Sequence, residues 1–309
     1  MIFNRKRIVK FGEIPMELEL KKKRKPINRL NELSGTEWIK FTKTWFIHRP
    51  APRENAKLLH PAAFPESLAR EFIEFFTKRG GLILDPFLGT GSTLIASVES
   101  NRSCIGVEVV EKWADVAQAR VDKLLAQKRG SDHLLKTMGL TPEKLLIKVI
   151  HGDSRYLSKF WEENKFPLVD YCITSPPYWN QLKRNYIRQK ERTEMGLETK
   201  YSEELNDIGN IDDYNGFLKA IKEIFNEVYK ITKNRGYLTV ITNNVFFDGR
   251  VYPLAFDTAK ILSAEPCPWI LKDEKIWLQD DKPLLPLGVY NAWIGNRAHQ
   301  YCLILRKEE

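Results

Sequence analysis

Short apolar runs alternate with helical stretches along most of this 309-residue chain, and this alternation constrains its fold more than any other feature. Runs with the length and composition of buried strands lie at residues 82–85, 103–109, 145–153, 169–174, 236–242 and 300–306. Helical periodicity occupies residues 66–76, 92–100, 111–128 and 212–233. Strands joined by helical crossovers form a parallel sheet covered on both faces. The sequence therefore predicts a doubly wound, mostly parallel α/β fold with ligands at the carboxyl ends of its strands.

The N-terminal segment differs from the rest in charge. Residues 1–30 hold ten Lys or Arg against three Glu, a net +7, while the whole chain carries +9. This asymmetry favours a polyanionic partner, although a solvated basic tail has the same composition. We predict a basic arm over residues 1–37 and one catalytic domain over residues 38–309. Prolines and aromatics at residues 38–65 favour an extended, packed connector over a helix.

Several protein classes are disfavoured by composition. No apolar run approaches the length of a membrane span, and the basic N-terminus has no apolar segment behind it, so we expect a soluble, cytoplasmic protein without membrane contact. The four cysteines are widely separated, which favours neither a zinc site nor a disulfide framework, and we expect no metal. Three of them lie in apolar runs and are expected to be small buried hydrophobes: Cys104, Cys172 and Cys302.

A glycine turn follows the first strand of the predicted sheet, in the segment LILDPFLGTGST. Gly89 and Gly91 let the backbone approach a ligand, and a helix beginning near Ser92 offers free N–H groups. A P-loop would need lysine where Ser92 stands, and the dinucleotide fingerprint would need glycine where Leu94 stands. The turn is therefore predicted to bind a cofactor of another class, with a nicotinamide dinucleotide as the weaker interpretation.

Two carboxylates end the next two strands. Glu108, nineteen residues after Gly89, can accept both hydroxyls of a ribose, which favours an adenosine-containing ligand over a simple helix N-terminal charge. Asp153 can hold an adenine amino group, although an N-cap is the commoner role for an aspartate in this position.

The fourth strand stops at Ser175-Pro176-Pro177-Tyr178, a turn that presents a hydroxyl, a rigid carbonyl and an aromatic ring. The lone pair of an exocyclic amine is delocalised into its ring, and accepting the protons of that amine would localise it. The Ser175 hydroxyl and the Pro176 carbonyl can accept them, held in place beforehand by the fixed proline φ angles. Tyr178 offers a ring on which a flipped base can stack. The turn is thus suited to reaction at an amino group.

These segments resemble the amino-methylating DNA methyltransferases that use S-adenosylmethionine, the N4-cytosine and N6-adenine group. The resemblance covers about residues 45–305, because the family's motifs occur in the order of one of its circular arrangements: HPAAFP, DPFLGTGST, GVEV, GDS, TSPPYW and the final HQYCLILRK. It implies a Rossmann-like methyltransferase sheet that binds S-adenosylmethionine and releases S-adenosylhomocysteine.

The resemblance also implies roles for individual residues. It places the methionine part of the cofactor at Phe64 and Pro65, and the cofactor's centre at Asp85, Phe87, Gly89, Thr90 and Gly91. It assigns the ribose to Glu108 and the adenine to Asp153. The catalytic tetrad would be Ser175, Pro176, Pro177 and Tyr178. Serine in the first position of the tetrad is more typical of N4-cytosine enzymes, which favours cytosine as the methylated base over adenine.

Double-stranded DNA is the expected partner. A basic segment directly after the tetrad is predicted to grip backbone phosphates, although a solvated helix face has a similar pattern: Lys183, Arg184, Arg188, Lys190 and Arg192. Insertions at residues 181–211 and 263–297 are predicted to contact DNA, and the second could instead cover the sheet. The family resemblance also suggests a restriction-modification system, with a cognate endonuclease encoded nearby that is not a stable subunit.

Three alternatives compete with this prediction. Cys267 lies in a Pro-Cys pair like the nucleophile of carbon-5 cytosine methyltransferases, but it comes too late in the chain for that chemistry. An RNA-modifying enzyme could use the same proline turn on an RNA base. A non-catalytic DNA-binding protein with a degenerate fold is disfavoured by the intact glycine turn, Glu108 and tetrad.

Overall fold

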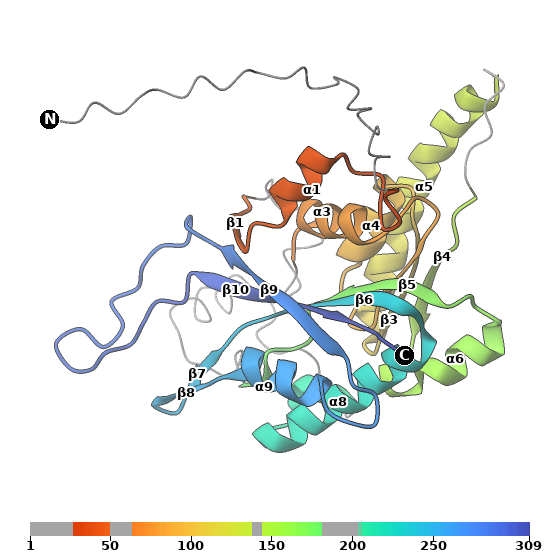
Figure 1. The fold of residues 1–309 in the computed structure, drawn as a ribbon. Helices are drawn as coiled ribbons and strands as arrows, with labels where there is room; N and C mark the ends of the chain where they lie inside the picture. The colour runs from red at the N-terminus through yellow and green to blue at the C-terminus, as the bar shows by residue number, and fades with distance from the viewer. Residues whose placement is uncertain (1–26, 50–63, 138–143, 181–203, 205) are drawn as a thin grey trace, which may run out of the picture.

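The structure is a computed structural model that describes residues 27–49, 64–137, 144–180, 204 and 206–309. Its centre is an eight-stranded sheet in the order β1-β9-β10-β6-β5-β2-β3-β4 (Figure 1). In that order the strands are Trp45–Ile47, Ile270–Leu278, His299–Arg306, Thr232–Thr242, Val169–Thr174, Leu82–Asp85, Ser103–Glu108 and Ile147–His151. β10 is antiparallel to both of its neighbours, and all other pairs are parallel. The predicted mostly parallel, doubly wound sheet is confirmed.

Helices cover both faces of the sheet, as Figure 1 shows. One face carries α1 (Gly35–Phe41), α3 (Glu66–Phe76), α4 (Ser92–Glu99) and α5 (Glu111–Thr137), of which the side chains are described to residue 128. The other face carries α6 (Leu157–Asn164), α8 (Tyr214–Ile231) and α9 (Leu254–Leu262). Successive side chains of a strand point to opposite faces of the sheet, where they pack in two separate hydrophobic cores. Ile83 packs with α3 and α4, while Leu84 packs with α8.

The chain reverses its direction across the sheet at β2. From β2 it moves outward through β3 to β4, and it then returns to β5 on the opposite side of β2. The loops that follow β2 and β5 therefore diverge at the carboxyl edge of the sheet, which is where doubly wound folds bind ligands.

One part of the predicted connector is wrong. Residues 38–41 were expected to be extended, but they belong to helix α1. A capping box causes this, because the Ser34 hydroxyl accepts from the Glu37 amide while the Glu37 carboxylate accepts from the Ser34 amide. Residues 45–47 are extended as expected and form β1 at the edge of the sheet, and residues 50–63 lie outside the described residues.

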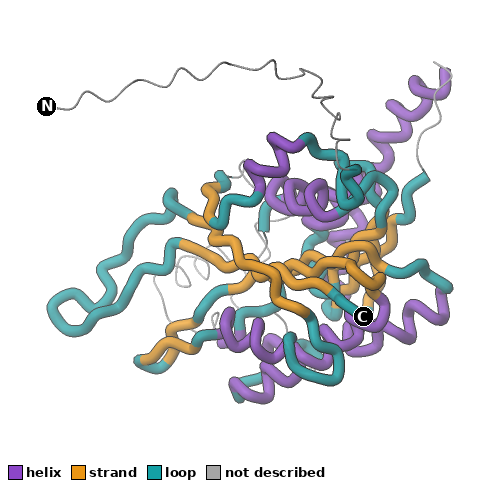
Figure 2. Tube along the Cα trace, in the orientation of Figure 1, coloured by secondary structure: helices purple, strands orange, loops and turns teal. Residues whose placement is uncertain are grey.

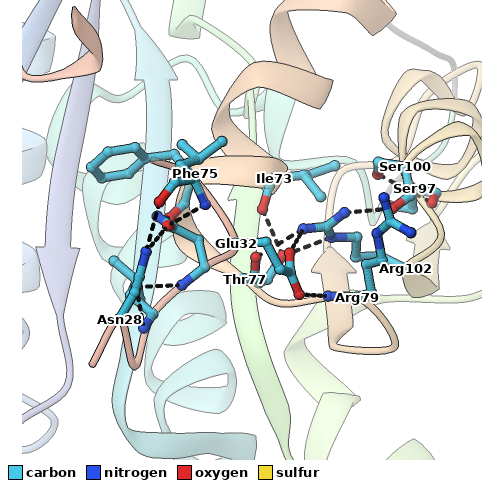
Figure 3. Close-up of polar contacts among 12 residues, drawn as sticks. Asn28, Glu32, Ile73, Phe75, Thr77, Arg79, Ser97, Ser100 and Arg102 are labelled. Carbon is cyan, nitrogen blue, oxygen red and sulfur yellow. Dashed lines mark hydrogen bonds and ion pairs between the residues drawn. The ribbon is translucent and has the colours of Figure 1, made fainter. Parts of the chain in front are cut away.

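Residues 27–34 pack onto the domain through polar contacts (Figure 3). Asn31 is 2% exposed and donates to the Phe75 carbonyl at the end of α3, at 2.5 Å. Glu32 accepts from Arg102 at 3.0 Å. Residues 1–26 lie outside the described residues, so the boundary of the basic arm at residue 37 stays a prediction.

Helices α6 and α9, strand β9 and a small hairpin have no counterpart in the sequence prediction. The hairpin pairs β7 (Val245–Phe247) with β8 (Arg250–Tyr252) and lies beyond the carboxyl end of β6. β9 occupies the beginning of the insertion predicted at 263–297, and it is a strand of the central sheet. Figure 2 shows the remainder as a long loop between β9 and β10 that projects from the sheet. DNA contact by this loop stays a prediction.

Helix α8 begins at a side-chain cap that can be tested directly. Asp213 accepts a 2.6 Å hydrogen bond from the Gly216 amide, one of the N–H groups that the helix leaves without a partner. Asp213→Ala should lower the free energy of unfolding by about 1 kcal/mol. Urea denaturation measures this, and Asp213→Ser, which keeps a capping oxygen, is the matched control. Equal losses in both variants would contradict the capping role.

Candidate functional site

A cleft opens at the carboxyl edge of the sheet, where the loops after β2 and β5 diverge. Its walls come from segments far apart in sequence. They are Phe64 before α3, residues 86–90 and 92 after β2, residues 108–110 and 113 after β3, residues 153–154 after β4, residues 175–177 after β5, residues 206–208, and Ile224 of α8. The fold thus brings the glycine turn, the two predicted ribose and adenine carboxylates and the proline turn to one cavity.

The glycine turn has the backbone that its sequence predicts. Gly89 and Gly91 both have positive φ, 54° and 84°, a conformation that other residues rarely adopt. A Cβ atom on Gly91 would also lie 3.0 Å from the Cβ of Ala117, so this glycine lets α4 begin close against α5. Gly89 and Thr90 line the cleft, whereas Gly91 lies behind it as the N-cap of α4.

Glu108 links the glycine turn to the end of β3. One carboxylate oxygen accepts from the Gly89 amide at 2.7 Å, and the other accepts from the Val110 amide at 3.0 Å. The side chain is largely buried, and burial raises its pKa to about 7 even though both amides favour the charged form. Each oxygen keeps a lone pair, so the carboxylate can still accept hydroxyl groups from a ligand in the cleft.

Asp85 lies beneath the cleft and does not line it. It is 1% exposed, and it accepts from the Thr93 hydroxyl at 2.5 Å and from the Thr174 hydroxyl at 2.6 Å. The Phe87 amide donates a third hydrogen bond at 3.1 Å. Burial raises the pKa of Asp85 to about 6, although the three hydrogen bonds favour the charged form and act to lower the pKa. The residue therefore ties the ends of β2 and β5 to α4 and sets the shape of the cleft floor.

The other predicted cofactor residues occupy different positions around the cleft. Phe64, Phe87 and Asp153 line it, while Pro65 is the N-cap of α3. Asp153 also caps a 3-10 turn, Ser154–Tyr156. Its Oδ2 atom accepts hydrogen bonds from the Arg155 side chain, from Nε at 2.9 Å and from Nη2 at 2.6 Å. The N-cap interpretation is thus confirmed, and the binding of adenine by this carboxylate stays a prediction.

The proline turn presents its first three residues to the cleft: Ser175, Pro176 and Pro177. The Ser175 Oγ lies 2.9 Å from the Tyr178 hydroxyl, and that hydroxyl donates to the Gln300 side-chain carbonyl at 3.0 Å. Tyr178 is 8% exposed. Trp179, at φ 44°, donates from its indole N–H to the Asp212 carbonyl and packs against the ring of Tyr252. The tetrad is therefore followed directly by a buried tryptophan that packs in an aromatic cluster with Tyr214, Phe247 and Tyr252.

Sequence reasoning missed several cleft residues. Trp113, 1% exposed, forms part of the wall beside Glu108, and the nearby motif GVEVVEKW could have indicated it. Asn206, Asp207 and Ile208 come from the end of the insertion predicted at 181–211, and they line the cleft although nothing in their sequence marks a ligand site. Gln300, at the start of β10, reaches the proline turn from the last strand of the chain.

Other predictions fall outside the cleft. The predicted phosphate contacts lie outside the described residues: Lys183, Arg184, Arg188, Lys190 and Arg192. All four cysteines are buried, as expected for Cys104, Cys172 and Cys302. Cys267 packs in the core under α8 and is absent from the cleft walls, which argues against a carbon-5 nucleophile. Among the described residues, no helix has both the length and the apolar character needed to cross a membrane.

Comparison with known proteins agrees with the sequence resemblance. Residues 1–119 match the DNA methylase family, N6_N4_Mtase. The chain is 34% identical over 74 residues to the orphan methyltransferase M.BamHII of Bacillus amyloliquefaciens, covering 24% of this chain and 28% of that protein. It is 32% identical over 92 residues to the type II methyltransferase M.BglI of Bacillus subtilis, covering 30% of this chain and 26% of that protein. The match thus spans about a quarter of each relative's length.

The crystal structure of TrmN from Thermus thermophilus is similar over 78% of this chain and 48% of that one, with 14% identity and a TM-score of 0.43. The resemblance to the amino DNA methyltransferases is thus confirmed by sequence, in a matched segment that ends before the proline turn.

Proposed function

Because residues 1–119 match the DNA methylase family, we propose that the chain transfers a methyl group from S-adenosylmethionine to an exocyclic amino group of a base in DNA. The observation that carries the proposal is the position of Ser175. This residue lines the same cleft as the glycine turn and Glu108, so a residue that can accept from an amine and the proposed cofactor-binding wall share one cavity.

The lining of the cleft fits S-adenosylmethionine in its chemistry. Apolar walls from Phe64, Phe87 and Trp113 suit an adenine ring and an aliphatic chain. The buried hydroxyls of Thr90 and Ser92 have no hydrogen-bond partner among the described residues, which is the state expected of groups that a ligand completes. Glu108 would hold the ribose hydroxyls, and the bound sulfonium would supply an activated methyl group.

The chain's own residues act on the amine. The Ser175 Oγ and the Pro176 carbonyl would accept the two N–H groups of the target amine, and this would localise its lone pair and make the nitrogen a nucleophile toward the methyl group that the cofactor would supply. Both acceptors are held before substrate arrives, because two consecutive prolines restrict the turn and Tyr178 contacts the Ser175 hydroxyl. The ring of Tyr178 is proposed to stack on the flipped base.

The methylated position is proposed to be N4 of cytosine in double-stranded DNA. The support is the resemblance of the tetrad, which begins with Ser175 and not with the Asp or Asn common in adenine enzymes. Adenine N6 is the alternative, and it keeps the same mechanism. The basic N-terminal segment and a cytoplasmic location are consistent with a nucleic-acid substrate, and a restriction-modification role with a separately encoded endonuclease completes the proposal.

Methyl transfer with labelled cofactor tests this function. The protein is incubated with methyl-labelled S-adenosylmethionine and either unmethylated genomic DNA or total RNA, and the nucleic acid is digested to nucleosides for mass analysis. Label in N4-methylcytosine is the expected result. Label in N6-methyladenine would show that the target base is adenine and not cytosine. Label confined to RNA would contradict the proposal that DNA is the substrate. Binding of cofactor without transfer to either polymer would overturn the catalytic proposal.

Cofactor affinity should depend on pH through Glu108. Its raised pKa of about 7 means that the carboxyl is mostly protonated below neutral pH and becomes an ionised acceptor above it. Charge-assisted hydrogen bonds are stronger, so affinity for 5′-methylthioadenosine should rise roughly five-fold from about pH 6 to about pH 8. This ligand lacks the amino acid part of the cofactor, whose own titration would obscure the effect.

Isothermal titration calorimetry across the pH range measures this dependence. Glu108→Gln should weaken binding and flatten the pH profile, since the amide does not ionise. Asp85→Asn is the matched control, because Asp85 is also buried with a raised pKa but lies beneath the cleft. If the pH dependence persists in Glu108→Gln and disappears in Asp85→Asn, the titrating group is Asp85 and the prediction for Glu108 is contradicted.

A further inference from the structure

Gln300 connects the last strand of the chain to the catalytic turn. In the antiparallel register of β10 and β6, Tyr301 lies opposite Thr242, which places Gln300 one step beyond the carboxyl end of β6. On its other side Gln300 pairs with Trp277 of β9. Because β10 runs opposite to the other strands, it is the beginning of this strand that lies at the ligand edge of the sheet. From there the Gln300 side chain reaches the Tyr178 hydroxyl at 3.0 Å.

The hydrogen atoms in this chain of contacts can be counted. A tyrosine hydroxyl has one hydrogen to donate, and that of Tyr178 goes to the Gln300 carbonyl oxygen. The 2.9 Å contact between Ser175 and Tyr178 must then use the serine hydrogen, with the phenol oxygen as acceptor. Ser175 lines the cleft and has no second hydrogen, so its oxygen can meet a target amine only as an acceptor. This is the state that polarising an amine requires.

We infer that Gln300 is a positioning residue that sets the direction of the Gln300–Tyr178–Ser175 hydrogen-bond chain and so keeps the Ser175 oxygen an acceptor for the target amine. The inference rests on the proposed function. Without an acceptor at position 300, Tyr178 is able to turn its hydrogen toward Ser175. The Ser175 hydroxyl no longer needs to donate to Tyr178, so its O–H can rotate toward the amine nitrogen. There it would donate to the lone pair that must attack the methyl group.

Three replacements at position 300 separate acceptor from donor chemistry. Gln300→Leu removes the acceptor, and it should lower kcat for methyl transfer about ten-fold, the effect of one lost hydrogen bond, with KM for DNA and Kd for cofactor nearly unchanged. Gln300→Glu supplies a group that only accepts and should restore most of the turnover. Gln300→Lys supplies a group that only donates, reverses the chain, and should be at least as slow as Gln300→Leu. The exposed Gln118→Leu on α5 is the matched control.

A second measurement does not depend on turnover. Protein labelled with [ζ-13C]tyrosine gives a resonance for Tyr178, assigned by its loss in Tyr178→Phe, that reports hydrogen bonding of the phenol. It should move in Gln300→Leu and move much less in Gln300→Glu. A resonance that does not respond to Gln300→Leu would overturn the inference whether or not the protein is active.

The kinetic outcomes are equally decisive. If Gln300→Glu is as slow as Gln300→Leu, or if both lose cofactor affinity and thermal stability in proportion to turnover, the residue has a structural role and the inference fails. Turnover in Tyr178→Phe should not fall further when Gln300→Leu is added, because both changes break the same chain. A wild-type protein that methylates neither DNA nor RNA would instead refute the proposed function, and the Tyr178 resonance would still decide the orientation of the hydrogen bonds.

Discussion

Ser175→Ala should lower kcat for DNA methylation by roughly a hundred-fold, as the loss of one preorganised polar group at a reacting centre does in other enzymes. Alanine keeps the turn and removes the oxygen that accepts the amine proton. That acceptor matters most in the transition state, when the N–H bonds become more acidic. Affinity for S-adenosylmethionine should therefore change by no more than about two-fold.

Two assays on one protein preparation test whether Ser175→Ala lowers the rate of methyl transfer without lowering cofactor affinity. Single-turnover methyl transfer gives the rate of the chemical step, and calorimetry gives the cofactor Kd. Ser67→Ala is the matched control, since Ser67 is an exposed serine outside the cleft walls. Equal losses of rate and affinity in Ser175→Ala would mean that the hydroxyl supports cofactor binding and would contradict its role toward the amine.

Arg102→Leu should cost about 3 kcal/mol of folding free energy, because it leaves buried acceptors without a donor. Arg102 is 3% exposed, and its guanidinium donates to the carbonyls of Ser100 at 2.5 Å and Thr77 at 2.9 Å. It also binds Glu32 at 3.0 Å, and thereby joins residues 27–34 to the end of α3 and the start of β3 (Figure 3). Burial lowers the pKa of Arg102, while the charge of Glu32 opposes this.

Urea denaturation with Arg79→Leu as control checks the Arg102 prediction. Arg79 lies beside the same glutamate, but its side chain is exposed, so its replacement should change stability by less than about 0.5 kcal/mol. Glu32→Gln should cost less than about 1 kcal/mol, because that side chain is 46% exposed and the ion pair is screened by water. If Arg102→Leu is as stable as Arg79→Leu, the two carbonyls must find other donors.

The strands that were predicted best are those whose burial is complete. Leu82–Asp85 and Val169–Thr174 have the predicted bounds, because both are short apolar runs bounded by glycine or proline, with nearly every side chain inside the protein. β9 was missed for the opposite reason. Its first five residues are exposed, and its sequence ILKDEKIWL reads as a polar segment, so sequence pattern alone could not place it between β1 and β10.

The candidate site was predictable where its residues follow strands directly. Glu108 is the last residue of β3, the glycine turn, Asp153 and Ser175 closely follow β2, β4 and β5, and parallel strands bring their carboxyl ends to one edge. Asp207 and Gln300 could not be predicted in this way. Asp207 returns to the cleft from a long insertion, and Gln300 depends on the reversed direction of β10, which local sequence does not encode.

Because β10 is antiparallel to β9, the loop between these two strands could be exchanged as a unit. His299 lies opposite Leu278 in the antiparallel register, so the two ends of the intervening segment are already closed at the spacing of a hairpin. A foreign sequence spliced between these two residues would inherit a fixed anchor on each side without altering sheet order. The junction lies one residue from Gln300, so an exchanged loop would begin next to the proline turn, and loop replacement would test the predicted contact with DNA.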